Sequence, residues 1–110
     1  MKISKDTCRL ALVQAEPALF DKAACVEKAL DYIGRSAAQG AELIVFPELF
    51  IPGYPIGMNF GFSVGKRTVA GRADWKRYYD ASMAEGDEDF MKLSQAAVKA
   101  KAYVSLGFSQ

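Results

Sequence analysis

The sequence predicts an α/β fold in which short strands alternate with helices. Apolar runs of strand length occupy residues 8–15, 42–46 and 103–108, and segments with helical spacing separate them. A strand, a helix and a second strand form a right-handed βαβ unit if the two strands are parallel. With 110 residues the chain can bury one modest core, and it is too short for two domains.

The first strand is predicted from alternation within residues 8–15. Leu10 and Leu12 share one face of this run, and Val13 lies on the opposite face. Glu16–Pro17 then breaks the pattern, so we expect the strand to end there.

A helix follows the first strand. Asp21 is suited to cap its first turn, and Gly40 is suited to the left-handed conformation that ends a helix. The apolar residues between them recur at steps of three and four, which is the spacing of one helical face. They are Val26, Leu30, Ile33 and Ala37.

The second strand, residues 42–46, is a continuous apolar run after Glu42. Such runs are typical of strands buried on both faces by covering helices. Pro47 cannot donate a ladder hydrogen bond and disfavours helix at Phe46, so the strand should stop at this point.

The rest of the chain predicts a long loop, two helices and a third strand. Residues 52–72 are rich in glycine and aromatic residues, which indicates a shaped loop. Residues 73–84 are expected to be helical, and Asp87 begins the next helix with acidic residues in its first turn. The third strand, residues 103–108, lies almost at the end of the sequence, and this predicts the first part of a larger domain.

Composition and charge exclude several functional classes. The formal net charge is +1, so the chain has no overall electrostatic preference for nucleic acid or an acidic membrane. Histidine is absent, which excludes a histidine triad or a histidine-ligated zinc site within this chain. No run approaches the roughly 18 apolar residues that span a bilayer, and the polar start lacks signal-peptide features. We therefore expect a cytoplasmic protein without a membrane partner.

Glu48 is the first candidate for chemistry. It follows the second strand, and ligand sites of open α/β sheets lie beyond the carboxyl ends of strands. In apolar surroundings desolvation would raise its pKa toward the range of a general base. A loop glutamate that points to water or pairs with an arginine is the alternative, and local context leaves both open.

Three other features have a structural alternative to a functional one. Aromatic residues near Glu48 are suited to wall an apolar pocket with the Tyr54 hydroxyl as a polar group, or to pack in the core. Cys8 and Cys25 are expected to be small buried hydrophobes of a reducing compartment rather than nucleophiles. Residues 61–68 resemble a phosphate loop but have the wrong glycine spacing, so a nucleotide site is rejected.

A basic set mixed with aromatic residues is compatible with nucleic-acid binding. Because the total charge is near neutral, a solvated face or a subunit contact is the preferred interpretation, and we expect no nucleic-acid partner. The set comprises Lys66, Arg67, Arg72, Lys76 and Arg77, with Trp75, Tyr78 and Tyr79.

Several segments together carry a resemblance to a known family. They read ALVQA at residues 11–15, AQGAELIVFPE at 38–48 and FIPGYP at 50–55. The first two resemble the start of the nitrilase (carbon–nitrogen hydrolase) superfamily, and the third resembles its nitrilase branch rather than its amidase branches. FGFSVG at residues 60–65 is similar to plant-type nitrilases and their bacterial relatives.

This resemblance implies a fold, a site and an activity. The implied fold is part of an α-β-β-α sandwich, with residues 1–110 as the N-terminal part of a single carbon–nitrogen hydrolase domain. The implied activity converts a small-molecule nitrile to a carboxylic acid and ammonia through a cysteine thioimidate, without metal or cofactor. Glu48 matches the catalytic glutamate of a Glu-Lys-Cys set, and Tyr54 matches a position that borders the substrate pocket. The family forms homo-oligomers, dimers or larger.

The resemblance leaves two catalytic groups unmatched. The family lysine follows the third strand, whereas Lys92, Lys99 and Lys101 precede it; the family cysteine follows the glutamate, whereas both cysteines of this chain precede it. We therefore expect the 110-residue chain to be inactive alone. The alternatives are a related amidase, a branch that processes cyanide or cyanoalanine, and a non-catalytic α/β interaction module.

Overall fold

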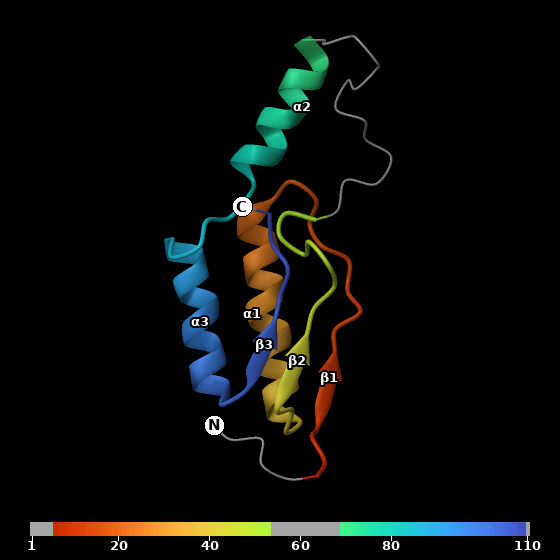
Figure 1. The fold of residues 1–110 in the computed structure, drawn as a ribbon, viewed down its shortest axis with the longest axis vertical. Helices are drawn as coiled ribbons and strands as arrows, with labels where there is room; N and C mark the ends of the chain where they lie inside the picture. The colour runs from red at the N-terminus through yellow and green to blue at the C-terminus, as the bar shows by residue number, and fades with distance from the viewer. Residues whose placement is uncertain (1–5, 54–68, 110) are drawn as a thin grey trace.

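Three parallel strands and three helices make up the computed structural model of this chain, which describes residues 6–53 and 69–109 (Figure 1). Their order along the chain confirms the predicted α/β class and the predicted βαβ unit. The elements are β1 (Leu10–Leu12), α1 (Lys22–Ala38), β2 (Leu43–Val45), α2 (Val69–Asp80), α3 (Glu88–Ala100) and β3 (Tyr103–Ser105).

The sheet has the order β1-β2-β3, and both pairs are parallel. Ile44 in the central strand pairs with Ala11 on one side and with Val104 on the other. Each regular strand is only three residues long, shorter than the apolar run that predicts it. The pairing of β2 with β3 continues at Phe46, whose N–H bonds the Ser105 carbonyl at 2.8 Å. Pro47 then has no N–H to donate.

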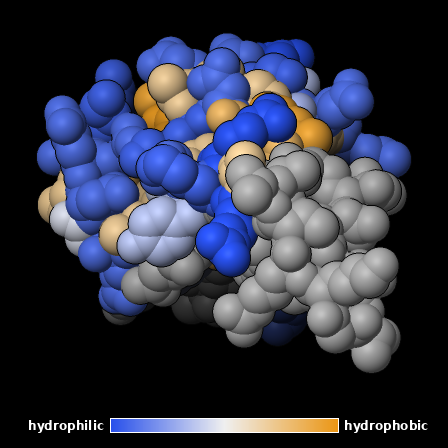
Figure 2. Space-filling view, turned by 90° about the horizontal axis from the view of Figure 1, so that it is seen from above, coloured by the Kyte–Doolittle hydropathy of each residue, from blue (hydrophilic) through white to orange (hydrophobic). Residues whose placement is uncertain are grey.

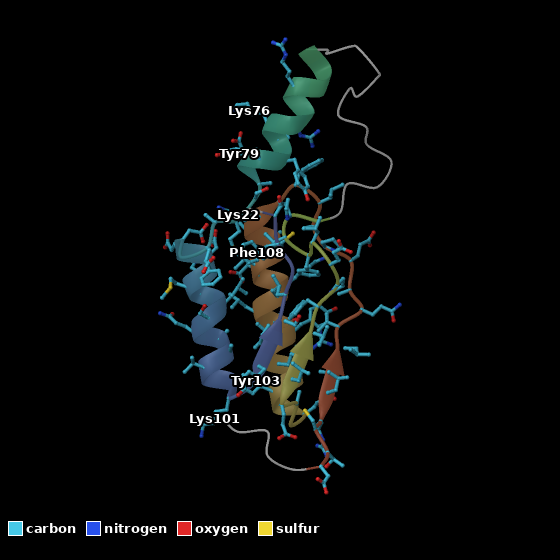
Figure 3. All side chains as sticks on the ribbon, viewed as in Figure 1. Lys22, Lys76, Tyr79, Lys101, Tyr103 and Phe108 are labelled. Carbon is cyan, nitrogen blue, oxygen red and sulfur yellow. The ribbon has the colours of Figure 1, made fainter. Side chains whose placement is uncertain are left out.

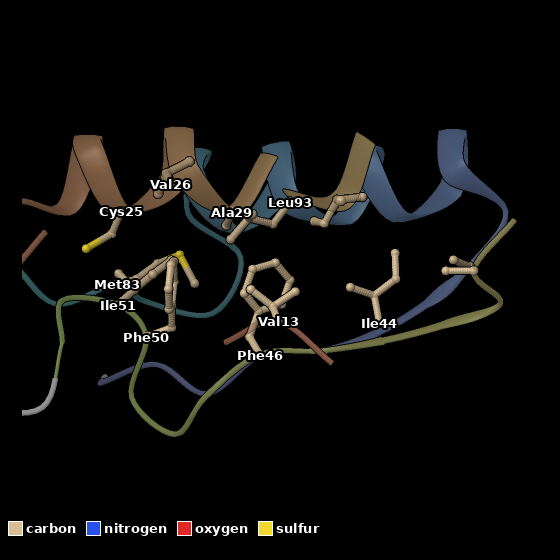
Figure 4. Close-up of a cluster of buried hydrophobic side chains, with 13 residues drawn as sticks. Val13, Cys25, Val26, Ala29, Ile44, Phe46, Phe50, Ile51, Met83 and Leu93 are labelled. Atoms are coloured by element: carbon tan, nitrogen blue, oxygen red, sulfur yellow. The ribbon is translucent and has the colours of Figure 1, made fainter. Parts of the chain in front are cut away.

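Helices α1 and α3 pack against each other and cover one face of the sheet, and the core lies between them and the strands (Figure 4). On the other face Leu10, Leu12 and Tyr103 are 50%, 71% and 52% exposed. The prediction that β2 is buried on both faces is therefore wrong for the described residues. Ile44 is buried toward the helices, whereas Leu43 and Val45 are only half-buried because no described element covers their face.

The ends of α1 confirm the predicted caps. The Asp21 carboxylate accepts a hydrogen bond from the Ala24 N–H at 3.0 Å, which satisfies a donor that has no partner within the helix. At the other end Gly40 has φ +84°, in the region that glycine adopts without steric cost, and its N–H bonds the Ala37 carbonyl.

Helix α2 begins and ends four residues earlier than predicted, since it spans Val69–Asp80 rather than residues 73–84. Contacts distant in sequence explain where it ends. Tyr78 is buried edge-on against Phe20, with ring centroids 5.8 Å apart, and the Met83 N–H bonds the Ser109 carbonyl instead of continuing the helix. Viewed from the α2 end, the described surface is mostly hydrophilic with small apolar patches (Figure 2).

Candidate functional site

The loops that follow all three strands meet at one end of the sheet, as parallel strands require. The Phe20 N–H, after β1, bonds the Pro52 carbonyl, after β2, at 3.1 Å. The Ser109 N–H, after β3, bonds the Ile51 carbonyl at 2.9 Å. This end of the sheet is therefore a connected backbone network, and Glu48 lies within it.

Glu48 is carried on a short turn that leaves the strand direction and returns to it. Residues 48–50 form the turn, and Leu49 has φ +49°, a left-handed conformation that is uncommon for a residue with a side chain. Non-glycine residues in this region are found where the surrounding structure fixes them, often at functional sites. The turn confirms that Glu48 stands beyond the carboxyl end of β2.

The strand β3 and its continuation hold both ends of this turn. Before the turn, Phe46 bonds Ser105; after it, Ile51 forms a parallel bridge with Phe108. Between these two anchors the β2 side contains residues 47–50, whereas the β3 side contains only Leu106 and Gly107. The extra residues on the β2 side form the turn that carries Glu48.

The Glu48 side chain is exposed. Of the two interpretations that local context leaves open, the described residues favour a loop glutamate that faces water over one in apolar, desolvated surroundings. The turn leaves Glu48 on the surface, whereas Phe50, two residues later, is fully buried. An exposed carboxylate on a fixed backbone is able to accept a proton from a group brought to this end of the sheet.

The aromatic residues on either side of Glu48 belong to the core rather than to a pocket. Phe46 is 5% exposed and Phe50 is fully buried, and their ring centroids lie 5.2 Å apart at an interplanar angle of 59° (Figure 4). Of the two interpretations that the sequence leaves open, core packing is correct for this pair. Tyr54 and the other aromatic residues of the predicted loop, Phe60 and Phe62, lie outside the described residues.

Neither cysteine is placed to be a nucleophile whose thiol proton Glu48 could accept. Cys25 is fully buried in α1, its Sγ donates to the Ala18 carbonyl at 3.1 Å, and burial raises the pKa of its thiol. Cys8 is exposed, contrary to the expected burial, and it precedes β1. Because β1 and β2 are parallel, Cys8 stands at the opposite end of the sheet from Glu48.

Lys99 and Lys101 lie at the opposite end of β3 from the turn that carries Glu48. Lys99 lies in the last turn of α3, and Lys101 caps that helix just before β3 begins. Figure 3 shows Lys101 beside Tyr103 at one end of β3 and Phe108 at the other. Lys92 is on an exposed position of α3.

The basic set around α2 is engaged in local contacts where it is described. Lys76 forms an ion pair with Asp80 at 2.9 Å, and the Arg77 guanidinium lies 4.6 Å from the centre of the Phe20 ring. Tyr78 is buried, whereas Tyr79 is exposed. These contacts favour the interpretation as a solvated face. Lys66 and Arg67 lie outside the described residues.

Metal sites and membrane-spanning helices are both absent from the described residues, 6–53 and 69–109. These residues contain no group of three or more cysteine, aspartate or glutamate side chains placed to hold a metal ion. They also contain no helix that combines the length and the apolar character needed to cross a membrane.

Gly107 is a residue near Glu48 that the sequence pattern alone does not select. An ideal Cβ built on it would lie 2.9 Å from the Leu49 nitrogen and 3.6 Å from the Glu48 Cα. The available signal is a glycine within an otherwise apolar strand pattern, which often marks a close approach of another backbone.

Comparison with known proteins gives one family and a consistent set of relatives. The carbon–nitrogen hydrolase family model matches residues 9–110. A bifunctional nitrilase/nitrile hydratase of Lupinus angustifolius is 39% identical over 101 residues, which is 92% of this chain and 29% of the relative. An aliphatic nitrilase of Sinorhizobium fredii is 41% identical over 90% of this chain and 32% of its own length. Nitrilase 2 of Arabidopsis thaliana is 36% identical over 94% of this chain and 31% of its own length. The chain thus spans about a third of the length of the curated relatives that it matches.

Proposed function

Because the chain belongs to the carbon–nitrogen hydrolase family, we propose that it forms the N-terminal part of a nitrilase domain in which Glu48 is the general base. The position of Glu48 carries this proposal. It is an exposed carboxylate on a turn that two backbone anchors fix, at the sheet end where α/β proteins place their ligands. The nitrilase names of the plant and bacterial relatives support the reaction class.

The proposed reaction begins with proton transfer from a cysteine thiol to the Glu48 carboxylate. The thiolate sulfur bonds to the nitrile carbon, one π bond of the C≡N group breaks, and the nitrogen takes up a proton to give a thioimidate. Water then adds to this carbon, ammonia leaves with a further proton, and a thioester remains. A second water molecule hydrolyses the thioester to the carboxylic acid and restores the thiol. Glu48 accepts and returns protons in each half of the cycle.

The cysteine and the lysine of this scheme come from outside residues 1–110. Cys25 is buried with a raised thiol pKa, and Cys8 and Lys101 stand at the far end of the sheet. The lysine would stabilise the negative charge that develops on the nitrile nitrogen. The proposal therefore includes that these 110 residues alone release no ammonia from a nitrile.

Four further parts of the proposal rest on the family resemblance: Tyr54 borders the substrate pocket, the substrate is a small-molecule nitrile, the complete protein is a homo-oligomer, and it uses no cofactor. The proposed cytoplasmic location rests instead on the two cysteines, which suit a reducing compartment. Tyr54 follows Glu48 by six residues and comes directly after Gly53.

One observation favours a second product. Relatives from Lupinus angustifolius are named for both nitrilase and nitrile hydratase activity. In the proposed cycle the tetrahedral adduct of the thioimidate can expel the thiolate instead of ammonia, and the product is then the amide. The ratio of amide to acid released from one nitrile distinguishes the two outcomes.

The test of the proposal is Glu48→Gln in the complete protein that contains this chain. Glutamine keeps the size of the side chain and removes the proton acceptor, so we expect kcat for ammonia release to fall on the order of 10²- to 10⁴-fold. The control is Glu27→Gln, the same chemical change at an exposed position of α1, which should leave kcat unchanged. A Glu48→Gln variant with the wild-type kcat would contradict the assignment.

A further inference from the structure

The turn that carries Glu48 lies directly against the backbone of Gly107. A Cβ atom at position 107 would stand 2.9 Å from the Leu49 nitrogen, 3.6 Å from the Glu48 Cα and 3.7 Å from the Glu48 carbonyl carbon. All three atoms are backbone, so no side chain can move aside to make room. The two segments touch at the residue that bears the candidate base and at the next one.

The need for glycine at position 107 is steric rather than conformational. Gly107 is not among the described glycines with positive φ, which are Gly40, Gly53 and Gly86. Alanine would therefore be able to adopt its backbone angles. What alanine cannot do is occupy the space already filled by the Leu49 nitrogen.

The hydrogen bonds around this contact prevent the two segments from separating easily. The turn is joined to β3 before Glu48 by Phe46 and Ser105, and after it by Ile51 with Phe108 and Ser109. With both ends anchored, the distance between the Gly107 backbone and the turn sets how far Glu48 projects from the sheet. We infer that Gly107 is a positioning residue for the Glu48 carboxylate, an inference that rests on the proposed function.

The size of the expected effect follows from the contact. Ordinary van der Waals contacts of a Cβ begin at 3.4 Å, so Gly107→Ala requires the turn to move by about 0.5 Å from its 2.9 Å contact. Misplacement of a catalytic group by about 1 Å can cost on the order of 10²-fold in rate. A shift of half this size predicts a loss of kcat of roughly tenfold, with KM unchanged because the moved group is the proposed base of the chemical step.

The experiment compares Gly107→Ala with Gly34→Ala in the complete protein, each in the wild-type and the Glu48→Gln background. Gly34 is an exposed position of α1 whose built Cβ meets nothing within 4 Å, so the same substitution should leave kcat unchanged there. If Gly107 acts through Glu48, Gly107→Ala lowers kcat in the wild-type background and has no further effect once Glu48 is glutamine. An equal loss in both backgrounds, or no loss in the wild-type background, would overturn the inference.

Two additions keep the inference testable if Gly107→Ala does not fold or the protein is inactive. Leu49→Gly loosens the same turn from the other side, because glycine adopts the left-handed conformation of Leu49 without strain. It should lower kcat only while Glu48 is present, and an unchanged kcat would count against positioning. If the wild-type complete protein hydrolyses no nitrile, the proposed function is refuted, and the positioning inference is then tested separately. A structure of Gly107→Ala then decides the positioning: displacement of residues 48–50 supports it, and an unmoved turn refutes it.

Discussion

Phe50 links the stability of the core to the geometry of the Glu48 turn. Its side chain is fully buried, it closes the turn that begins at Glu48, and its ring packs against Phe46 with centroids 5.2 Å apart (Figure 4). Phe50→Leu keeps an apolar side chain at this position but removes the ring that fixes it. We expect the substitution to lower both the stability and the activity of the complete protein.

The magnitude follows from the two interactions that change. Loss of an aromatic pair costs about 0.5–1.5 kcal/mol, and imperfect repacking after a change of shape adds up to about 1.5 kcal/mol. The sum is about 0.5–3 kcal/mol, well below the stability of about 5–15 kcal/mol of an ordinary folded protein, so the variant should fold. For a chain as long as the relatives, each kcal/mol lowers Tm by about 2–4 °C. The assay is thermal unfolding followed by circular dichroism, together with kcat for ammonia release well below Tm.

The matched control is Ile33→Val, which trims a buried side chain in the C-terminal half of α1, on a different element from the Glu48 turn. Its expected cost, about 0.5–1.5 kcal/mol, overlaps that of Phe50→Leu. At a temperature where both variants are folded, kcat should fall for Phe50→Leu and stay at the wild-type value for Ile33→Val. Equal kcat values for the two variants, or an unchanged Tm for Phe50→Leu, would refute the anchoring of Glu48 by this part of the core.

Two further predictions concern the helix caps and the thiols. Asp87→Ala should cost about 1 kcal/mol at neutral pH, measured as a drop in Tm, because the carboxylate caps α3. The N–H groups of Phe90 and Ala84 lower the pKa of Asp87, so its stabilisation is complete above its ordinary pKa of 3.8 and is lost as the pH falls through the lowered folded value. The Tm difference from wild type should therefore narrow in acid, and a constant difference would contradict this account. With iodoacetamide at pH 7, peptide mass spectrometry should find Cys8 labelled in the folded protein and Cys25 labelled only after unfolding; rapid native labelling of Cys25 would be the contrary result.

Local sequence signals predict both ends of α1 well because their causes are local. Asp21 satisfies an N–H three residues away, and Gly40 needs only its own freedom of φ, so both ends of α1 follow from the residues themselves. The bounds of α2 could not be predicted in this way. Its end depends on the contact of Tyr78 with Phe20 and on the Met83 hydrogen bond to Ser109, partners that sequence spacing does not reveal.

The candidate site shows the same division. That Glu48 stands beyond a buried strand follows from the apolar run and Pro47, both of which are local. The exposure of the Glu48 side chain does not follow from local sequence, because it depends on how residues 47–50 bulge against a segment nearly sixty residues later. The close approach of Gly107 depends on the same distant pairing, and only the unusual presence of glycine in a strand pattern hints at it.

The arrangement of the turn explains how an exposed carboxylate can still be well positioned. A glutamate on a free loop would have to lose its backbone freedom at the moment of reaction, whereas here folding has already fixed it through the anchors on either side. This solution depends on the register of β3 against β2. A slip of one residue would place Leu106 or Phe108, rather than Gly107, opposite the Leu49 nitrogen, where a Cβ has no room. The same glycine that allows the turn to sit close to the sheet therefore also selects the strand register that holds the Glu48 turn in place.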